Sequence, residues 1–435
     1  MGEPAPPDPA TAARLRRWQG VTVGTLFVGY AGYYVCRSVL PVASNQLMND
    51  PGLGLDEVGY GRLVAAGIYA YAAWKLLTGV GTEYAGGRAA FLAGMVLSAG
   101  CVAAFGLAGG TAAFLAAWVA NRFVQSMGWA ALVRVTGRWF RPEALGTVMG
   151  VLCLSYLFGD ALARLYLGAF AGAGLGWRGL FFVAAGTLAA VTAAAAVTLR
   201  ATPKAVGLPE PPPPPGNVYG AADDGDTRVP VRALLGPLLG SRMFWLVALM
   251  NAGLTMIRET FNSWTPRYLE KGVGLDPRYA GLLSFVFPMA GAAASLAAGW
   301  GADRLGGRYG RLIVPLLVLT AAALAAVVVI DLRDRAVLAL ALVGTVALFM
   351  MGPYTFCSGV LAMNLGGKRA AAAAAGIVDA VGYLCGAVVS GEVAGPLVKA
   401  YGFGPLLEVL LGLSAATLGV AVVYWGLEER RRRAR

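Results

Sequence analysis

The chain has 435 residues, of which 58% are hydrophobic and only 13% are charged, and its mean hydropathy is +0.65. A soluble chain needs about a quarter charged residues to cover its surface, so most of this surface must face a lipid bilayer. The formal net charge of +12 comes mostly from Lys and Arg in short segments between apolar runs, which favours membrane topology and argues against nucleic-acid binding.

The residue types do not support an enzyme or a metal site. The sequence has no His, which excludes His-based acid–base chemistry and most zinc sites. It also lacks a nucleotide-binding loop, a metal cluster and a nucleophile–base pair, so we predict a protein that is not an enzyme and uses no cofactor and no metal. The cysteines lie in apolar stretches without paired spacing and are interpreted as small core residues: Cys36, Cys101, Cys153, Cys357 and Cys385.

Apolar segments long enough to cross a bilayer, which takes about 20 residues, follow one another along the whole chain. Residues 1–18 precede the first segment and end in basic residues, and we expect them to form a cytoplasmic N-terminal segment before a retained first helix. The predicted membrane helices are 19–43, 62–82, 89–108, 112–136, 146–170, 178–198, 242–263, 279–301, 311–330, 336–361, 371–397 and 403–426.

A long polar segment divides these twelve helices into two sets of six. Residues 199–241 contain the run Pro211–Pro215 and an acidic patch around Asp223, which is typical of a linker. The sequence therefore predicts an all-α integral membrane protein with six-helix bundles over 19–198 and 242–426 and a basic tail over 427–435. Lys and Arg gather on the side that holds both termini, which places the termini in the cytoplasm, in the cell (inner) membrane.

The second helix of each set is followed by the same loop pattern, G-x-G-x-[D/E]-x-x-G-G-R, at residues 79–88 and 299–308. The matching position in both halves indicates an internal repeat. Two related six-helix halves with this loop resemble the major facilitator superfamily, which implies a major facilitator fold with two pseudo-symmetric bundles. We expect a gating or structural role for the charged residues of these loops: Glu83, Arg88, Asp303, Arg304 and Arg308.

Basic residues inside membrane helices cost roughly 2.5–3.5 kcal/mol each on insertion scales, so each needs a cavity, a partner or a function. Arg37 and Arg258 lie on the first helices of the two halves, and the pseudo-twofold relation places them across a central cavity. Neither has an obvious carboxylate on its own helix face, because Glu259 is adjacent to Arg258 and points about 100° away. Two unpaired guanidinium groups would bind a dianion such as phosphate, whereas the alternative is a structural bridge to a carboxylate on the fifth or eleventh helix. The six such residues are Arg37, Lys75, Arg122, Arg134, Arg164 and Arg258.

Tyrosines share helix faces with these cations. Tyr30 and Tyr34 lie on the face of Arg37, and Tyr71 lies one turn before Lys75. Such tyrosines could donate hydrogen bonds to phosphate or hydroxyl groups, or could simply pack in an aromatic core.

The remaining intramembrane charges have more than one interpretation. Asp160 and Arg164 are spaced to form an internal ion pair. Asp379 could balance a basic residue, contact substrate hydroxyls or carry a proton, and Arg134 is expected to serve structure or gating.

Four further motifs narrow the resemblance. Gly29–Arg37 reads G-Y-x-x-Y-Y-x-x-R, Tyr71–Lys75 reads Y-x-x-x-K, Gln125–Trp129 reads Q-x-x-G-W, and Arg258 stands six residues before Trp264-Thr-Pro. Together these motifs resemble the organophosphate:phosphate antiporters, the group of glycerol-3-phosphate and hexose-phosphate transporters. The resemblance implies that Arg37 and Arg258 bind phosphate, that Lys75 assists, and that the two halves rock about the site.

The resemblance also extends the expected substrate site to Trp129, Tyr156, Asp379 and Tyr383. Tyr156 stands where the glycerol-3-phosphate member has a His, which puts strict glycerol-3-phosphate specificity in doubt. The implied function is exchange of a phosphorylated small metabolite, a sugar phosphate or a glycerol phosphate, for inorganic phosphate across the lipid bilayer by a monomer. The alternatives are a membrane sensor of external hexose phosphate and a proton-coupled organic anion carrier that uses Asp379 or Glu392.

Overall fold

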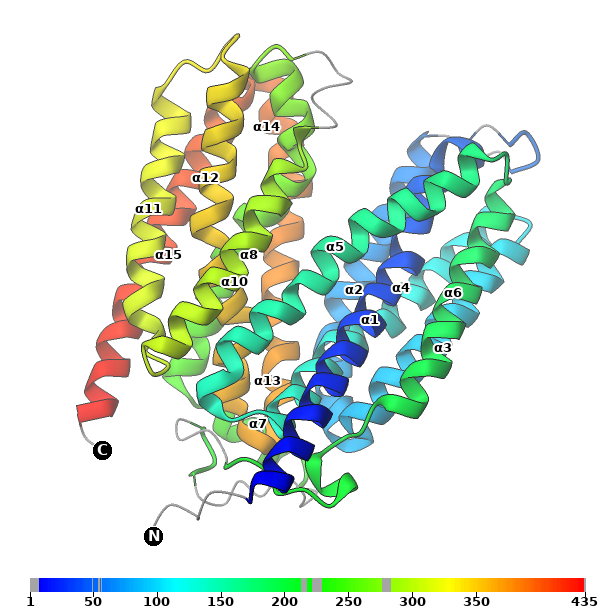
Figure 1. The fold of residues 1–435 in the computed structure, drawn as a ribbon. Coiled ribbons are helices and arrows are strands. Elements are labelled where there is room, and N and C mark those ends of the chain that lie inside the picture. The colour runs from blue at the N-terminus through cyan, green and yellow to red at the C-terminus, as the bar shows by residue number, and fades with distance from the viewer. Residues whose placement is uncertain are drawn as a thin grey trace.

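The computed structural model describes residues 8–48, 50–53, 55, 57–212, 217–220, 229–275 and 283–433. In these residues the chain is helical throughout its long elements and contains no β-strand. The long helices form two bundles, one from each half of the sequence (Figure 1). This arrangement confirms the predicted all-α fold.

The first bundle consists of six long helices joined by short turns. The turn between the second and third of them requires Gly86, whose φ of 84° is a backbone conformation that side chains other than glycine rarely adopt. A short 3-10 turn, η1 (Pro142–Ala144), precedes the fifth helix. The helices are α1 (Pro9–Met48), α2 (Glu57–Ala85), α3 (Gly87–Leu107), α4 (Thr111–Trp139), α5 (Leu145–Gly172) and α6 (Trp177–Thr198).

The second bundle repeats this plan but contains more irregular turns. Its helical run over residues 336–401 is broken at Gly367, where φ is 59° and ψ is −152°, so the run crosses the bundle twice. Its elements are α8 (Arg242–Arg267), the π-helical turn η4 (Tyr268–Gly272), α10 (Val286–Arg304), α11 (Tyr309–Val329), α12 (Ala336–Thr355), η5 (Phe356–Leu361), α13 (Ala362–Ala387), η6 (Val388–Val393), α14 (Ala394–Tyr401) and α15 (Phe403–Arg433).

Length and apolarity alone identify seven of the described helical segments as membrane spans, or eight if α8 and the short helix before it, α7 (Val231–Leu239), count as one bent span. The long 336–401 segment counts once in that number although it is broken at Gly367. Taken singly, α2, α4, α8 and α10 do not qualify. Three of them carry a buried cation, Lys75, Arg122 or Arg258, and a charged residue lowers the mean hydropathy of a helix.

The predicted linker is partly helical. It contains a 3-10 turn, η2 (Pro203–Val206), and the short helix α7 (Val231–Leu239), which meets α8 at an angle of 76°. The acidic patch at Asp223, the prolines from 213 to 215 and the start of the helix predicted at 279 lie outside the described residues.

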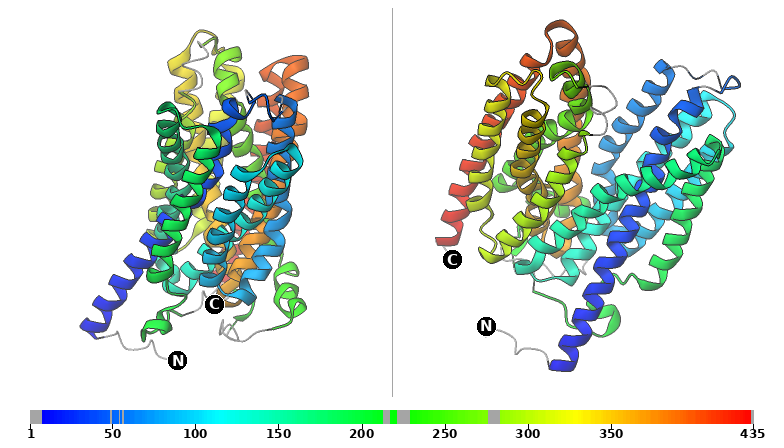
Figure 2. Two further views of the ribbon diagram at one scale, coloured as in Figure 1. Left: turned by 90° about the vertical axis from the view of Figure 1, so that its right-hand side faces the viewer. Right: turned by 45° about the horizontal axis from the view of Figure 1, so that its top comes forward.

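The two bundles are in close contact at the end of the molecule where α1 begins and α15 ends, and they diverge toward the other end (Figures 1 and 2). Helix α2 packs against α13 and α5 against α10 there, and glycines let the backbones touch. A Cβ atom on Gly79 would lie 2.9 Å from the carbonyl oxygen of Ala372, and one on Gly146 would lie 2.6 Å from that of Gly299. Small residues at helix contacts are the usual means of close packing in membranes.

Candidate functional site

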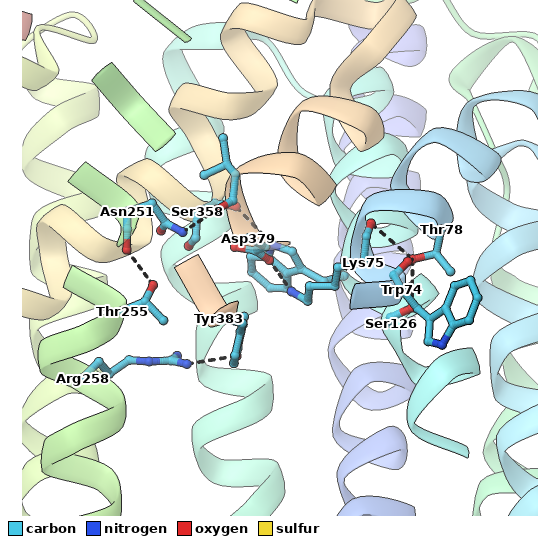
Figure 3. Close-up of polar contacts among 12 residues, drawn as sticks. Trp74, Lys75, Thr78, Ser126, Asn251, Thr255, Arg258, Ser358, Asp379 and Tyr383 are labelled. Atoms are coloured by element: carbon cyan, nitrogen blue, oxygen red, sulfur yellow. Dashed lines mark hydrogen bonds and ion pairs between the residues drawn. The ribbon is translucent and has the colours of Figure 1, made fainter. Parts of the chain in front are cut away.

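An ion pair between the two halves lies at the centre of the molecule. Lys75 on α2 donates to the Asp379 carboxylate on α13, and both side chains are almost fully buried (Figure 3). The lysine ammonium also lies 5.0 Å from the Tyr71 ring centroid and 4.9 Å from that of Tyr383. Of the three sequence-based interpretations of Asp379, the structure shows the first, in which it balances a basic residue.

Arg258 on α8 corrects the expectation that no carboxylate of its own helix pairs with it. Its guanidinium group forms an ion pair with Glu259, because a long arginine side chain can turn back to an adjacent residue even though the two Cβ atoms diverge. The same nitrogen donates to the Tyr383 hydroxyl at 2.9 Å, and the guanidinium carbon lies 4.3 Å from the Tyr354 ring centroid. Arg258 is therefore neutralised but still faces the interior (Figure 3).

Arg37 on α1 has a different environment, made of neutral groups. Its Nε donates to Gln125 Oε1 at 3.2 Å and its Nη1 donates to the Tyr34 hydroxyl at 3.1 Å. Its guanidinium carbon lies 4.6 Å from the ring centroids of both Tyr34 and Tyr71. Within the described residues no carboxylate pairs with Arg37.

Aromatic rings connect the two arginines across the interface of the halves. Tyr71, whose ring lies against Arg37, makes an edge-on contact with Tyr383 at a centroid distance of 5.4 Å, and Tyr383 accepts the hydrogen bond from Arg258. The rings line a partly open cavity of about 20 Å³, enough for about one water molecule. It is lined by residues from both halves: Tyr30, Tyr34, Lys75, Trp129, Tyr156, Arg258, Tyr354, Ser358, Asp379 and Tyr383.

The structure brings eight of the ten predicted substrate-site residues to this cavity wall, and the other two, Arg37 and Tyr71, contact its lining. Three buried polar atoms of the lining residues make no hydrogen bond with the described part of the chain: Tyr156 Oη, Arg258 Nε and Asp379 Oδ1. Because buried polar groups are nearly always paired, such atoms are candidates for ligand contacts.

Sequence reasoning missed Tyr354, Ser358 and Arg122. Tyr354 and Ser358 lie on α12 and η5, and Ser358 accepts a hydrogen bond from the Trp129 indole at 3.1 Å. The internal repeat offered a signal, because this helix is the counterpart of α4, which carries Trp129. Arg122 was recognised as an intramembrane charge without an assigned role, and it lies 4.6 Å from the Tyr71 ring centroid.

The two repeated loops make equivalent contacts at the closed end. Glu83 accepts from the backbone N–H groups of Ala372 and Ala373 in the other half, at 2.5 and 3.1 Å, and also pairs with Arg134. Asp303 accepts from the backbone N–H groups of Gly146 and Thr147 at 3.0 and 2.7 Å. Each loop carboxylate thus binds the start of a helix of the opposite bundle, where amide groups have no helical partner.

The remaining predicted gating residues have local roles. Arg88 donates to the carbonyl oxygens of Ala196 and Leu199 near the end of α6, Arg304 stacks on the Trp300 ring, and Arg308 directly precedes α11. Asp160 and Arg164 form the expected ion pair at 2.9 Å, and Asp160 also accepts from Ser38.

Cations and tyrosine hydroxyls around a cavity between two halves are suited to bind a small anion. These features and the paired six-helix bundles define a membrane carrier. The Major Facilitator Superfamily model matches residues 26–390, so the chain belongs to this family. The family comprises transporters, which confirms that the chain is a transporter and not an enzyme.

Several curated relatives are named as transporters of organic phosphates. The membrane sensor protein UhpC of Salmonella typhimurium is 27% identical and the glycerol-3-phosphate transporter of Bacillus subtilis is 24% identical, each over 93% of this chain and 92% of the relative. The phosphoglycerate transporter protein of Salmonella typhimurium is 22% identical over 93% of this chain and 89% of that protein. These relatives confirm the resemblance predicted from the motifs.

Solved structures agree on the fold. The transporter FucP in its outward conformation superposes with a TM-score of 0.72 at 13% identity, covering 93% of this chain and 98% of that one. The proton:xylose symporter XylE superposes with a TM-score of 0.67 at 14% identity, covering 94% of this chain and 96% of that one.

Proposed function

We propose that this protein exchanges a phosphorylated small metabolite, a sugar phosphate or a glycerol phosphate, for inorganic phosphate by alternating access. The observation that carries the proposal is the set of buried cations from both halves around one tyrosine-lined cavity, with Arg37 unpaired by any carboxylate of the described chain. Relatives named as a glycerol-3-phosphate transporter and as a phosphoglycerate transporter protein support the substrate class.

Phosphate suits this site for a chemical reason. A guanidinium group presents parallel N–H donors that match two phosphate oxygens, and it keeps its charge at every physiological pH. Inorganic phosphate and an organic phosphate share the same anionic head group, so both can use Arg37, Arg258 and Lys75. The organic part would then contact the tyrosines, Trp129 and Tyr156.

Obligate exchange follows from the positive charge of the site. The cavity holds only about 20 Å³ in this structure, so the side chains around it must move apart before a phosphate can bind. An unliganded site with unpaired cations would have to pass through the closed state without a counter-charge, which is costly in a low-dielectric interior. We therefore expect return of the carrier to be slow unless a second phosphate compound binds.

We expect the cytoplasm to lie at the end where the bundles meet and both termini are found, so that the structure is open toward the outside. We also propose that the protein resides in the cell (inner) membrane and functions as a monomer. The basic tail of α15, Arg430–Arg433, lies at this end, as the distribution of Lys and Arg in membrane proteins favours.

Counterflow in proteoliposomes tests the proposal. Vesicles loaded with unlabelled phosphate should take up labelled phosphate, and the uptake should be inhibited by a panel of sugar, glycerol and three-carbon acid phosphates. Arg37→Lys and Arg258→Lys should each reduce exchange at least about tenfold without lowering expression, because lysine keeps the charge but loses the planar pair of donors. Wild-type exchange by both variants would rule out this anion site.

A sensor is the second candidate, because a relative that covers 93% of the chain at 27% identity is named as a membrane sensor. A sensor retains the binding site but carries no bulk flux. Hexose-phosphate binding to the purified protein without any phosphate counterflow in vesicles would favour the sensor over the exchanger.

A further inference from the structure

Arg122 on α4 is a buried cation that the proposed exchange mechanism does not use. Its side chain is 8% exposed, and it lies one turn from Gln125 on the same helix. Its Nη1 donates to Gln125 Oε1 at 3.4 Å and its Nε donates to the carbonyl oxygen of Gly67 at 3.4 Å. No carboxylate of the described chain pairs with it, although Lys75 and Arg258 both have such partners.

Arg122 and Arg37 converge on one acceptor. Gln125 Oε1 accepts from Arg37 Nε at 3.2 Å as well as from Arg122 Nη1, and both guanidinium carbons lie 4.6 Å from the Tyr71 ring centroid. Two like charges this close repel one another in an interior of low dielectric, and a neutral amide oxygen compensates them only in part. The arrangement is therefore complementary to an anion.

The acceptor is held in place by a buried network. Gln125 is 1% exposed, and its Nε2 donates to Ser98 at 3.1 Å and to Asn121 at 3.2 Å. Asn121 in turn accepts from Ser98 at 2.7 Å. With the amide nitrogen fixed in this way, the oxygen is directed at the two arginines, and an anionic oxygen near it would accept from both.

We propose that Arg122 is a further phosphate-binding residue, and that Arg37 and Arg122 together hold the phosphate group on the first half of the molecule. This inference rests on the proposed phosphate exchange, and it adds that the phosphate group binds mainly to residues of the first half. Arg258 from the second half then leaves Glu259 and completes the site as the halves close. A phosphate dianion matches the two charges of the Arg37–Arg122 pair, so binding neutralises them.

The first test uses Arg122→Gln. The variant should raise the phosphate concentration that gives half-maximal exchange at least about tenfold, as expected for the loss of a charge-assisted hydrogen bond. Phosphate should raise the thermal unfolding midpoint of the purified wild type but hardly that of the variant, because a ligand stabilises only the state that binds it. Without phosphate, the variant should unfold at the wild-type temperature or above it, because the repulsion with Arg37 is removed.

Arg178→Gln is the matched control. Arg178 lies in the same half, donates to the carbonyl oxygens of Gly106 and Ala108, and stacks on the Trp177 ring at 4.2 Å, so it makes the same kinds of contact away from the site. Its substitution should lower the unfolding midpoint without phosphate but leave half-saturation unchanged. If Arg122 were purely structural, Arg122→Gln would also lower the unfolding midpoint without phosphate and leave half-saturation unchanged.

Gln125→Glu provides an independent test if the first variant does not fold. A carboxylate at this position would pair with both arginines, so the unliganded protein should become more heat-stable while phosphate no longer stabilises it. Wild-type phosphate affinity in Arg122→Gln, or in Gln125→Glu, would overturn the inference and leave the proposed function intact. Absence of phosphate exchange and of phosphate stabilisation in the wild type would overturn both.

Discussion

Lys75 and Arg258 each have a carboxylate partner in the central region, whereas Arg37 and Arg122 are bound by neutral groups among the described residues. Breaking a buried ion pair on one side leaves an uncompensated charge, while an arginine that contacts amides and rings can take an external anion without losing a carboxylate. The four basic side chains therefore differ in what a ligand must displace: Lys75 and Arg258 each have an ion pair to give up or share, whereas Arg37 and Arg122 have none among the described residues.

The Glu259→Gln substitution tests that difference. Glu259 competes with a ligand for Arg258, and glutamine keeps the shape but removes the negative charge. We expect the phosphate concentration at half-maximal exchange to fall by roughly threefold to tenfold, since an ion pair is about twice as strong as a neutral hydrogen bond. Phosphate titration in proteoliposomes measures this. An increase in the half-saturating concentration would show that Glu259 positions Arg258 for the ligand instead of withholding it.

Sequence reasoning identified the intramembrane cations and the Asp160–Arg164 pair, but not which carboxylates pair with Lys75 and Arg258. The cost of an arginine in a bilayer identified all of the cations, and the motifs identified Arg37, Lys75 and Arg258. The carboxylate partners of Lys75 and Arg258 could not be predicted from the sequence, for two different reasons. Asp379 lies 304 positions from Lys75 and approaches it only through the packing of α2 on α13, and Glu259 reaches Arg258 through side-chain torsions that helix periodicity does not describe. For Arg122 no motif indicated a role.

Among the elements, the linker makes specific contacts with both halves. Glu210 pairs with Arg138 on α4 at 2.9 Å and with Lys368 on α13 at 3.5 Å, and its side chain is only 5% exposed. The backbone of Val218 also donates to the carbonyl oxygen of Leu365. A proline-rich, polar composition predicts a connection between domains, but it gives no hint that one of its carboxylates is buried between them.

Removal of that carboxylate should destabilise the closed end. Glu210→Gln removes the negative charge that Arg138 and Lys368 share, so both buried ion pairs to the linker are lost. We expect a clear fall in the thermal unfolding midpoint of the purified protein. Glu270→Gln is the control, because Glu270 pairs with an exposed Lys271 and such surface pairs contribute at most about 1 kcal/mol. Equal effects of the two substitutions would contradict a bracing role for the linker.

Across the whole molecule, the two halves meet through glycines and helix starts at one end and diverge at the other (Figure 1). The apolar runs and the repeated loops were sufficient to predict twelve spans and their division into two bundles. The state of opening could not be predicted, because it depends on the balance between contacts of one end and contacts of the other. In the proposed alternating-access mechanism, the same sequence adopts a state closed at one end and a state closed at the other.

A valine at Gly79 should shift that balance. Its side chain would collide with the backbone of α13 and so force the meeting ends apart, whereas Gly81→Val on the same helix meets nothing within 4 Å. Nitroxide labels at the exposed positions 141 and 305, in a background without the native cysteines, should report a longer distance in Gly79→Val than in Gly81→Val. Identical distance distributions would mean that the glycine contact does not set the closed state.

The contacts of the Glu83 and Asp303 carboxylates also make the proposed separation of the bundles measurable by amide hydrogen exchange. Each shields two amide hydrogens at the start of a helix in the other bundle, at Ala372 and Ala373 and at Gly146 and Thr147. When the bundles separate there, these four hydrogens lose their acceptor and meet water. Their rate of replacement by deuterium would therefore count openings directly, without any label, and the rates at the two sites should rise and fall together if the bundles move as rigid bodies.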